Sequence, residues 1–483
     1  MFTLGIDLGT QGVRAVVSDR LGRVAAASGA VFEKNAIAGA DGCSEQDVLS
    51  WWDTVICVIR DITGKMKEKG CRPEDILALS VDGTSGTVTL LDKDHTPLCA
   101  GIMYNDSRAA EEAAIVGMKA ASLEKKLGYS FNSSFALPKV LRLKNRMPES
   151  FKRCRYVVHQ SDFIVGRLTG VYNVSDYSNA LKSGYDLLDK KWPELIEDEL
   201  GIEIGILPEI VRPGAAIANI SNEASRITGL STRTVVTAGA TDGYASAIAS
   251  GIAEPGDFNT TLGTTMVIKG ITRNLIHDKE GRVYCHLHPD GYWMPGGASN
   301  VGGRCLNNRF DSSEFAEYDK GIGQITPTGI LAYPLVGKGE RFPFLNKEAE
   351  EFITGNVTDK KHLFAALMEG VAYSERLAYD TLYELGCEPA KRIFVTGGAV
   401  KSMEWSQIRA NVLNTAILIP RVFETAMGSA IIAASGTLFS SLKEASCNMV
   451  GIREAVNPQP EKAEAYEELY DSFKKECKAR GYN

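Results

Sequence analysis

The sequence has no paired cysteines and no long apolar run. Its ten cysteines stand singly, and because none forms a C-x-x-C pair, neither a zinc ribbon nor a disulfide framework is indicated. Scattered thiols of this kind are typical of a reducing compartment. No apolar stretch approaches the length of a membrane span, and the N-terminus lacks the regions of a secretion signal. We therefore expect a cytoplasmic protein with no membrane partner.

The sequence also lacks a surplus of positive charge. Its 53 lysines and arginines are outnumbered by 60 aspartates and glutamates, which leaves a net charge of -7. Because proteins that bind nucleic acid usually present a basic face, we expect no nucleic-acid partner. The motif G-x-x-x-x-G-K-[ST] does not occur, which disfavours a Walker-type NTPase, and H-E-x-x-H does not occur either. The partners that remain are small molecules, and a homodimer stays open.

One pattern that is present occurs twice. Residues 2–17 and 258–268 each read as an apolar strand, a Gly-Thr turn and a second apolar strand. Free backbone N–H groups at such a turn suit a phosphate oxygen. A Rossmann site is excluded, because a strand and not a helix follows Gly12. The repeat predicts two related lobes that face each other across a cleft and handle a nucleoside triphosphate, with Asp7 placed to hold a hydrated Mg²⁺.

The order of elements predicts an α/β fold in two domains, because 483 residues exceed one typical core. The break at Glu254–Asp257 places the boundary, giving domains 1–253 and 254–483. Asp7, Asp82, Asp242 and the pair Gly397-Gly398 all stand where apolar strands end. Ligands of α/β sheets bind at such ends, so these residues are expected to share one site.

Asp242 is the candidate for the chemistry. It follows an apolar strand and has small neighbours, Gly239, Ala240 and Gly243, which leave room for a substrate. Phosphoryl transfer to an alcohol needs a group that accepts the hydroxyl proton, and such a base contributes roughly 10²–10⁴-fold. The alternative interpretation of Asp242 is a helix N-cap.

Three further segments give local predictions. Ser44 is predicted to cap a helix that carries Val48 and Trp52. Residues 296–303 are interpreted as a glycine-rich loop close to the nucleotide. The run from Cys285 to His288 favours a strand and turn over a metal cluster.

Taken in order, these and other segments resemble the FGGY family of carbohydrate kinases over nearly the whole chain. The matching segments are Gly5–Thr10, Tyr104–Arg108, Ser175–Ala180, Gly239–Asp242, Thr261–Thr265, Gly296–Ala298, Gly339–Pro343 and Thr396–Ala399. The opening motif alone is shared with actin-like and Hsp70-type ATPases, whereas the ordered set is specific.

The resemblance implies two ribonuclease-H-like, actin-like ATPase domains with ATP and Mg²⁺ in the cleft. It implies that 1–253 is the sugar-binding lobe and 254–483 the nucleotide-binding lobe with a C-terminal helix. Asp242 would be the catalytic base and Asp7 the carboxylate for metal and substrate, with Asp82, Ser85 and Tyr104 as further substrate contacts. The nucleotide contacts would be Thr10, Gln11, Gly263, Thr264, Gly297, Gly397, Gly398 and Ser402.

The sugar is indicated by residues 82–86. Xylulokinases of the family usually carry a Met-His pair where this chain has Asp82-Gly83-Thr84-Ser85-Gly86. Four segments resemble instead the xylulokinase-like branch that is associated with D-ribulose: Val81–Ser85, His159–Asp162, Ser175–Asp186 and Gly296–Asn300. D-ribulose is therefore favoured over D-xylulose. Another polyol or ketose kinase stays open. An Hsp70-like ATPase without sugar phosphorylation is disfavoured, because only a short helical tail follows Ser440. A non-catalytic relic of the kinase fold is disfavoured, because Asp7 and Asp242 are retained.

Overall fold

The computed structural model describes residues 1–32, 37–38 and 42–482, and the chain divides into two compact units. Unit 1 comprises Met1–Ala253, His286–Gly291 and Val422–Gly451, and unit 2 comprises Glu254–Cys285, Tyr292–Arg421 and Ile452–Asn483. The first division falls at the segment where the sequence suggests a boundary. The later segment Val422–Gly451, however, belongs to unit 1.

Unit 1 is built on a sheet of six strands in the order β12-β13-β6-β1-β2-β3. The first three strands of the chain form an antiparallel meander, and β6 and β13 add to β1 in parallel. The first predicted hairpin is confirmed. The bounds are β1 Phe2–Leu8, β2 Gly12–Asp19, β3 Val24–Val31, β6 Ile76–Gly83, β12 Ala216–Asn219 and β13 Val235–Thr241.

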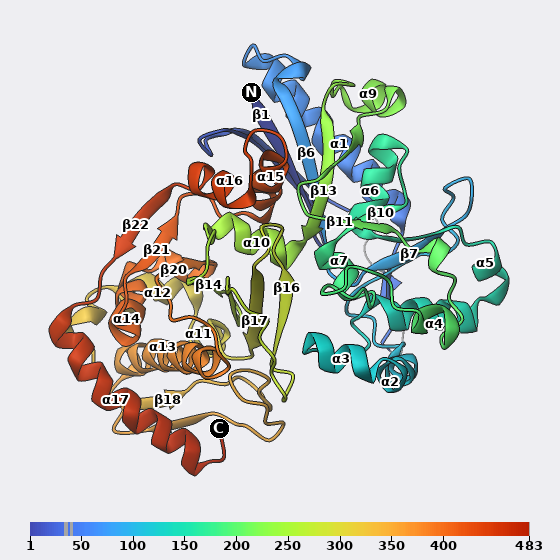
Figure 1. The fold of residues 1–483 in the computed structure, drawn as a ribbon. Helices are drawn as coiled ribbons and strands as arrows, with labels where there is room; N and C mark the ends of the chain where they lie inside the picture. The colour runs from blue at the N-terminus through green and yellow to red at the C-terminus, as the bar shows by residue number, and fades with distance from the viewer. Residues whose placement is uncertain (33–36, 39–41, 483) are drawn as a thin grey trace. The chain divides into compact units, whose positions relative to one another are not determined.

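Helices cover both faces of this sheet (Figure 1). On one face α1 (Val48–Glu68) and α6 (Gln160–Thr169) bury a core that includes Ile6, Trp51 and Phe163. On the other face lie α10 (Asp242–Ser250) and α15 (Thr425–Ser435). A Cβ at Gly5 would lie 1.8 Å from the carbonyl oxygen of Ala426, so the glycine is what allows α15 to touch β1.

The predicted cap of α1 is wrong. Asp47 is the N-cap, with its side chain accepting a 3.0 Å hydrogen bond from the backbone N–H of Leu49. Ser44 lies instead in the short strand β5 (Ser44–Gln46), which pairs with β4 (Ile37–Ala38) and β8 (Gly101–Ile102). Strand pairing fixes the backbone of Ser44 in an extended form, so the helix begins later.

Unit 2 repeats the topology of unit 1. Its sheet has the order β16-β17-β15-β14-β20-β21-β22, in which β14, β15 and β17 form an antiparallel meander and β20 and β21 continue in parallel. The two hairpins of the sequence therefore open two sheets of the same ribonuclease-H-like plan. The bounds are β14 Asp257–Leu262, β15 Met266–Gly270, β16 Val283–Leu287, β17 Trp293–Ser299, β20 Arg392–Thr396, β21 Ile417–Pro420 and β22 Ile452–Val456.

Of the two local predictions made for unit 2, one is confirmed and one is wrong in part. The strand predicted at Cys285 is confirmed as part of β16. The glycine-rich segment 296–303 is not a loop throughout, because residues 296–299 belong to β17 and pair with β15. Ladder hydrogen bonding to β15 determines this conformation, and the run of glycines did not reveal it.

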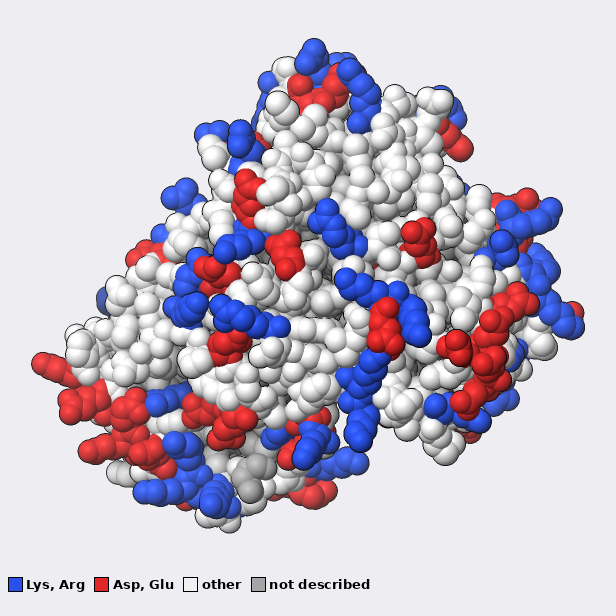
Figure 2. Space-filling model, viewed as in Figure 1, with Lys and Arg blue, Asp and Glu red and all other residues white. Residues whose placement is uncertain are grey.

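Long helices complete unit 2: α13 (Lys360–Glu384), α14 (Met403–Leu413) and α17 (Pro460–Ala479). The C-terminal helix α17 buries Tyr466, Tyr470 and Phe473 against the unit, as its apolar stripe predicted. Figure 2 shows acidic side chains over α17, whose exposed residues include Glu464 and Glu468. The helix is thus amphipathic, with one buried and one charged face.

All ten cysteines lie in the described part of the chain, and each has a free thiol. Within the same residues no helix combines the length and the apolar character that crossing a bilayer requires.

Candidate functional site

Three parallel strands bring three aspartates to one edge of the unit 1 sheet. Asp7 on β1 pairs in register with Asp82 on β6, and Ala240 on β13 pairs with Asp82 on its other side. Asp242 follows the end of β13 directly, as the first residue of α10. The parallel register therefore gathers the acidic residues of unit 1, while Gly397 and Gly398 stand at the end of β20 in unit 2.

Asp82 is fully buried behind Asp7. Its Oδ2 accepts a 2.5 Å hydrogen bond from Ser429 Oγ of α15. Burial raises the pKa of Asp82 well above its ordinary value, and the neighbouring charge of Asp7 adds to the effect. Burial also raises the pKa of Asp7, and the neighbouring Asp82 and Arg14 work against that shift. Asp82 Oδ1 has no hydrogen-bond partner among the described residues. Asp82 lies in register beside Asp7, and its contact with the sugar stays a prediction.

Asp242 is half-buried, and its Oδ1 accepts a 2.6 Å hydrogen bond from the backbone N–H of Gly243. The turn that carries it is fixed from behind. The N–H of Thr241 donates to Ser178 Oγ over 2.8 Å, and Ser178 Oγ donates to Asp176 over 2.6 Å. Asp176 caps the short helix α7 (Tyr177–Leu181). A carboxylate on such a rigid support is suited to act as a base.

Lys182 lies near Asp242. Burial lowers the pKa of its ammonium, and the negative charge of Asp242 works against that shift. Its Nζ also lies 5.6 Å from the centre of the Phe135 ring, in a cation–π contact. Sequence reasoning did not single out Lys182. It lies inside the segment Ser175–Asp186 of the family resemblance, which was the available signal.

The segment Gly83–Thr87 is held by side chains of α6 and the strand before it. Gln160 Oε1 accepts from the N–H of Thr84 over 2.9 Å and from Thr84 Oγ1 over 2.8 Å, and Thr84 Oγ1 lies 2.6 Å from Thr87 Oγ1. His159 Nδ1 donates to the carbonyl of Thr87 over 3.2 Å. Burial lowers the pKa of His159 to about 4, so its ring is neutral.

Ser85 is the exception in this segment. Its Oγ is buried and has no hydrogen-bond partner within the described residues. A buried hydroxyl without a partner is rare in proteins and is suited to a ligand that supplies one. Next to this segment, the N–H of Tyr104 donates to Thr87 Oγ1 over 3.2 Å, and the Tyr104 residue is 39% exposed.

The tip of the first hairpin borders an open cavity of about 1010 Å³. Its walls include the predicted residues Thr10, Gln11 and Tyr104, together with Arg14, which sequence reasoning had passed over. Gln46 Nε2 donates to the carbonyl of Thr10 over 2.7 Å, which fixes the tip. The cavity combines hydroxyl, amide and guanidinium groups, which suit a phosphoryl group.

Unit 2 has a cavity of about 650 Å³ of its own. Four predicted nucleotide residues line it: Gly263, Thr264, Gly398 and Ser402. Most other lining side chains are apolar or aromatic, among them Leu306, Phe315, Phe364, Met368 and Trp405. Apolar walls with a few polar groups at one side are typical of a site for a planar base and its ribose.

Of the nucleotide residues predicted in unit 2, two do not line this cavity. Gly297 lies inside β17, where a Cβ would meet the ring of Phe342 at 2.8 Å. Gly397 has φ of 89°, and a Cβ there would lie 2.5 Å from the carbonyl oxygen of Leu262. Both glycines therefore permit close packing beside the cavity.

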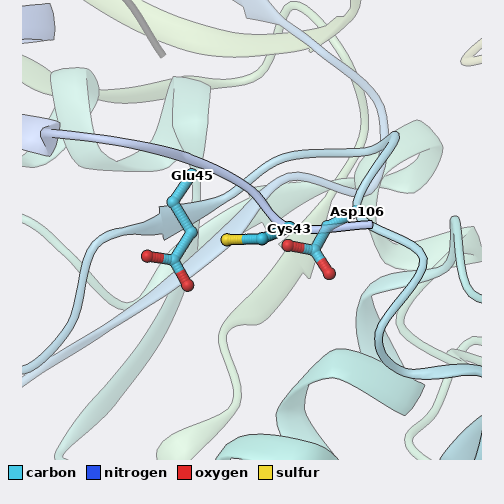
Figure 3. Close-up of side chains that lie close together, drawn as sticks. All are labelled: Cys43, Glu45 and Asp106. Carbon is cyan, nitrogen blue, oxygen red and sulfur yellow. The ribbon is translucent and has the colours of Figure 1, made fainter. Parts of the chain in front are cut away.

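Figure 3 shows a separate cluster of Cys43, Glu45 and Asp106, whose ligand-type atoms lie within 4.8 Å of one another. Arg108 supplies the positive charge of this cluster, because it donates to Glu45 and, over 2.7 Å, to Asp106. Burial alone would raise the pKa of Asp106, but hydrogen bonds from Arg108 and Ser44 hold this pKa below its ordinary value. The cluster is an ion-pair network that fixes the Tyr104 segment.

Comparison with known proteins gives a consistent result. Residues 2–249 match the N-terminal domain, and residues 258–437 the C-terminal domain, of the FGGY family of carbohydrate kinases. A xylulose kinase of Bacillus subtilis (strain 168) is 27% identical over 491 residues, which cover 98% of this chain and 96% of that protein. A gluconokinase of Bacillus licheniformis is 26% identical over 500 residues, covering 98% and 94%. The crystal structure of a xylulose kinase from Rhodospirillum rubrum matches with a TM-score of 0.87 at 25% identity and covers 99% of both chains.

Proposed function

The chain belongs to the FGGY family of carbohydrate kinases and is an ATP-dependent sugar kinase, and from this premise we propose that its substrate is a ketopentose, D-ribulose in preference to D-xylulose, which it converts to the 5-phosphate. The observation that carries the proposal is the edge of the unit 1 sheet, where Asp7, Asp242 and the Ser85 segment come together.

The proposed sugar rests on residues 82–86. This segment has no Met-His pair, and it offers the unpartnered hydroxyl of Ser85 to a polar ligand. The exposed ring of Tyr104 stands on the adjacent segment. D-xylulose is the second candidate, because relatives named xylulose kinase match 98% of the chain.

Asp242 is the proposed base. As the terminal hydroxyl oxygen of the sugar bonds to the γ-phosphorus of ATP, its proton passes to the Asp242 carboxylate and the bond to the ADP oxygen breaks. The hydrogen bonds that hold Thr241 and Ser178 restrict the carboxylate to one position. Thr10, Gln11 and Arg14 offer groups that suit the transferred phosphoryl oxygens.

Asp7 fits the proposed Mg²⁺ site. Its side chain is buried at a strand end, burial raises its pKa, and the fully buried Asp82 lies in register beside it. A carboxylate in this environment is stabilised by a divalent cation with oxygen ligands. When bound, Mg²⁺ supplies positive charge for the phosphoryl oxygens.

The cavity of unit 2 is the proposed adenosine site. Ser402 caps α14, and its hydroxyl donates to Asp319 Oδ1 over 2.5 Å while accepting from the N–H of Trp405 over 2.9 Å. These bonds fix one wall of the cavity opposite the apolar side chains. Gly263 and Thr264 leave the turn between β14 and β15 open for a phosphate.

An ADP-release assay tests the proposal. D-Ribulose, D-xylulose, L-ribulose, L-xylulose, gluconate, ribitol and glycerol are compared at equal concentrations with ATP and Mg²⁺. We expect the highest kcat/KM for D-ribulose. A higher kcat/KM for another compound would replace the proposed sugar, and ATP consumption that is independent of any sugar would favour the Hsp70-like alternative.

A further inference from the structure

Lys139 is a fully buried lysine beside the Ser85 segment. It lies on α4 (Ala136–Arg146), and its Nζ donates to the carbonyl of Gly86 over 2.9 Å and to the carbonyl of Ser134 over 3.3 Å. These hydrogen bonds go to two backbone carbonyls and not to a carboxylate. The two carbonyls belong to segments almost fifty residues apart in the sequence.

A buried ammonium that donates to no carboxylate is unfavourable, because its charge leaves water. The charge of Asp106 offsets this cost only in part. Burial, with the nearby charge of Lys182, lowers the pKa of Lys139 to about 7. An apolar side chain at this position would avoid the cost. Stability alone is therefore a poor reason for a lysine here.

The contacts of Lys139 hold the turn at Gly86 in place. Gly86 has φ of 84°, and a Cβ there would lie 2.2 Å from the carbonyl oxygen of Ser134. The two segments thus touch backbone to backbone, and Lys139 joins both carbonyls. Thr84 and Thr87 are held separately by Gln160 and His159. All these bonds surround Ser85, whose Oγ is buried and, like Gln160 Nε2, has no hydrogen-bond partner among the described residues.

We propose that Lys139 is a positioning residue for sugar recognition, which fixes Gly86 against Ser134 so that the Ser85 hydroxyl is presented to the substrate. The inference rests on the proposed function in one respect, that the segment 83–87 contacts the sugar. Lys139 itself touches no reacting atom. Its effect acts through the position of Ser85, so it concerns sugar affinity and the choice between epimeric sugars, and not the binding of ATP.

The test is the substitution Lys139→Met, which keeps most of the unbranched side chain and removes its donors. Lys144→Met is the matched control, because Lys144 lies on the same helix and its Nζ donates over 2.6 Å to the carbonyl of Leu200. We expect KM for the preferred sugar to rise about tenfold or more in Lys139→Met, while KM for ATP changes by less than about twofold. The ratio of kcat/KM between D-ribulose and D-xylulose should also move toward one. Lys144→Met should leave these values unchanged.

A second variant, Lys139→Gln, keeps amide donors without the charge and is expected to restore part of the sugar affinity. An unchanged sugar KM in Lys139→Met would overturn the inference. So would equal rises of KM for sugar and ATP, or unfolding of both Lys139 variants, since these outcomes describe a purely structural residue. The wild-type substrate panel is scored separately: if another sugar is preferred, the proposed function fails, and the Lys139 comparison is made with that sugar.

Discussion

Ser429 Oγ donates a 2.5 Å hydrogen bond to Asp82 Oδ2 and thereby joins two residues 347 positions apart in the sequence. Asp82 in turn lies in register beside Asp7. A helix from the C-terminal part of the chain therefore completes the surroundings of a carboxylate near the N-terminus. The glycine at position 5 makes this approach sterically permissible.

Replacing Ser429→Ala should lower the free energy of unfolding of unit 1 by about 1–3 kcal/mol, because Asp82 Oδ2 loses its buried donor. Urea unfolding followed by fluorescence measures the change. Ser435→Ala is the control on the same helix, since its Oγ donates only to the nearby carbonyl of Ile432 over 2.7 Å. Equal losses in the two variants would contradict a special role for the Ser429–Asp82 bond.

Asp242→Asn should lower kcat by roughly 10²–10⁴-fold, because the amide cannot accept the hydroxyl proton. Binding of ATP, measured by calorimetry, should stay close to that of the wild type. Asp53→Asn, at an exposed position of α1, is the control and should keep full turnover. Near-normal turnover in Asp242→Asn would remove Asp242 from the chemistry.

Two glycines of unit 1 should respond to alanine in opposite ways. Gly5→Ala places a Cβ 1.8 Å from the carbonyl oxygen of Ala426 and 2.3 Å from the backbone nitrogen of Ala430, so we expect a loss of several kcal/mol or failure to fold. Gly64→Ala, inside α1 with no atom within 4 Å of the new Cβ, should stabilise by about 0.5–1 kcal/mol. Thermal unfolding distinguishes the two, and a stable Gly5→Ala protein would show that α15 can move away from β1.

The buried Glu369 should make the stability of unit 2 depend on pH. Burial raises its pKa from the ordinary 4.5 to about 7, although Thr328 and Tyr466 donate hydrogen bonds to it. Between these values the unfolded chain loses the proton while the folded protein keeps it, so stability falls as pH rises.

Glu369→Gln removes this titration. The unfolding free energy of the wild type should therefore fall relative to the variant, by up to about 3 kcal/mol, between pH 4.5 and 7. Urea unfolding across this range provides the measurement, and Glu464→Gln on the exposed face of α17 is the control. A difference that stays constant with pH would exclude the proposed titration.

Ala316→Trp should fill the cavity of unit 2, because Ala316 lines it and is exposed. We expect KM for ATP to rise about tenfold or more, since a bulky ring occupies the space proposed for adenosine. KM for the sugar should stay unchanged in the same assay. Ala465→Trp, at an exposed position of α17, controls for an added surface aromatic, and an unchanged ATP KM in Ala316→Trp would place the nucleotide elsewhere.

Local patterns predicted the elements well and side-chain partners poorly. Alternating apolar residues and a Gly-Thr turn depend on neighbours within a few positions, so both hairpins and the strand ends at Asp7 and Asp242 could be recognised. Ser44 fits a capping pattern equally well, but it belongs to β5, whose pairing with β8 is non-local and prevails. The glycines near 297 read as a loop because the sequence does not show that they pair with β15.

The sequence by itself determined the α/β class, the repeated hairpins, the carbohydrate kinase family and the aspartates at strand ends, because each depends on local periodicity or on an ordered set of motifs. Only the tertiary structure decided that Asp82 is buried under Ser429, that Gly297 packs against Phe342, and that Lys139 holds the turn beside Ser85. The physical reason is that burial and hydrogen-bond partners depend on segments that meet only when the chain is folded.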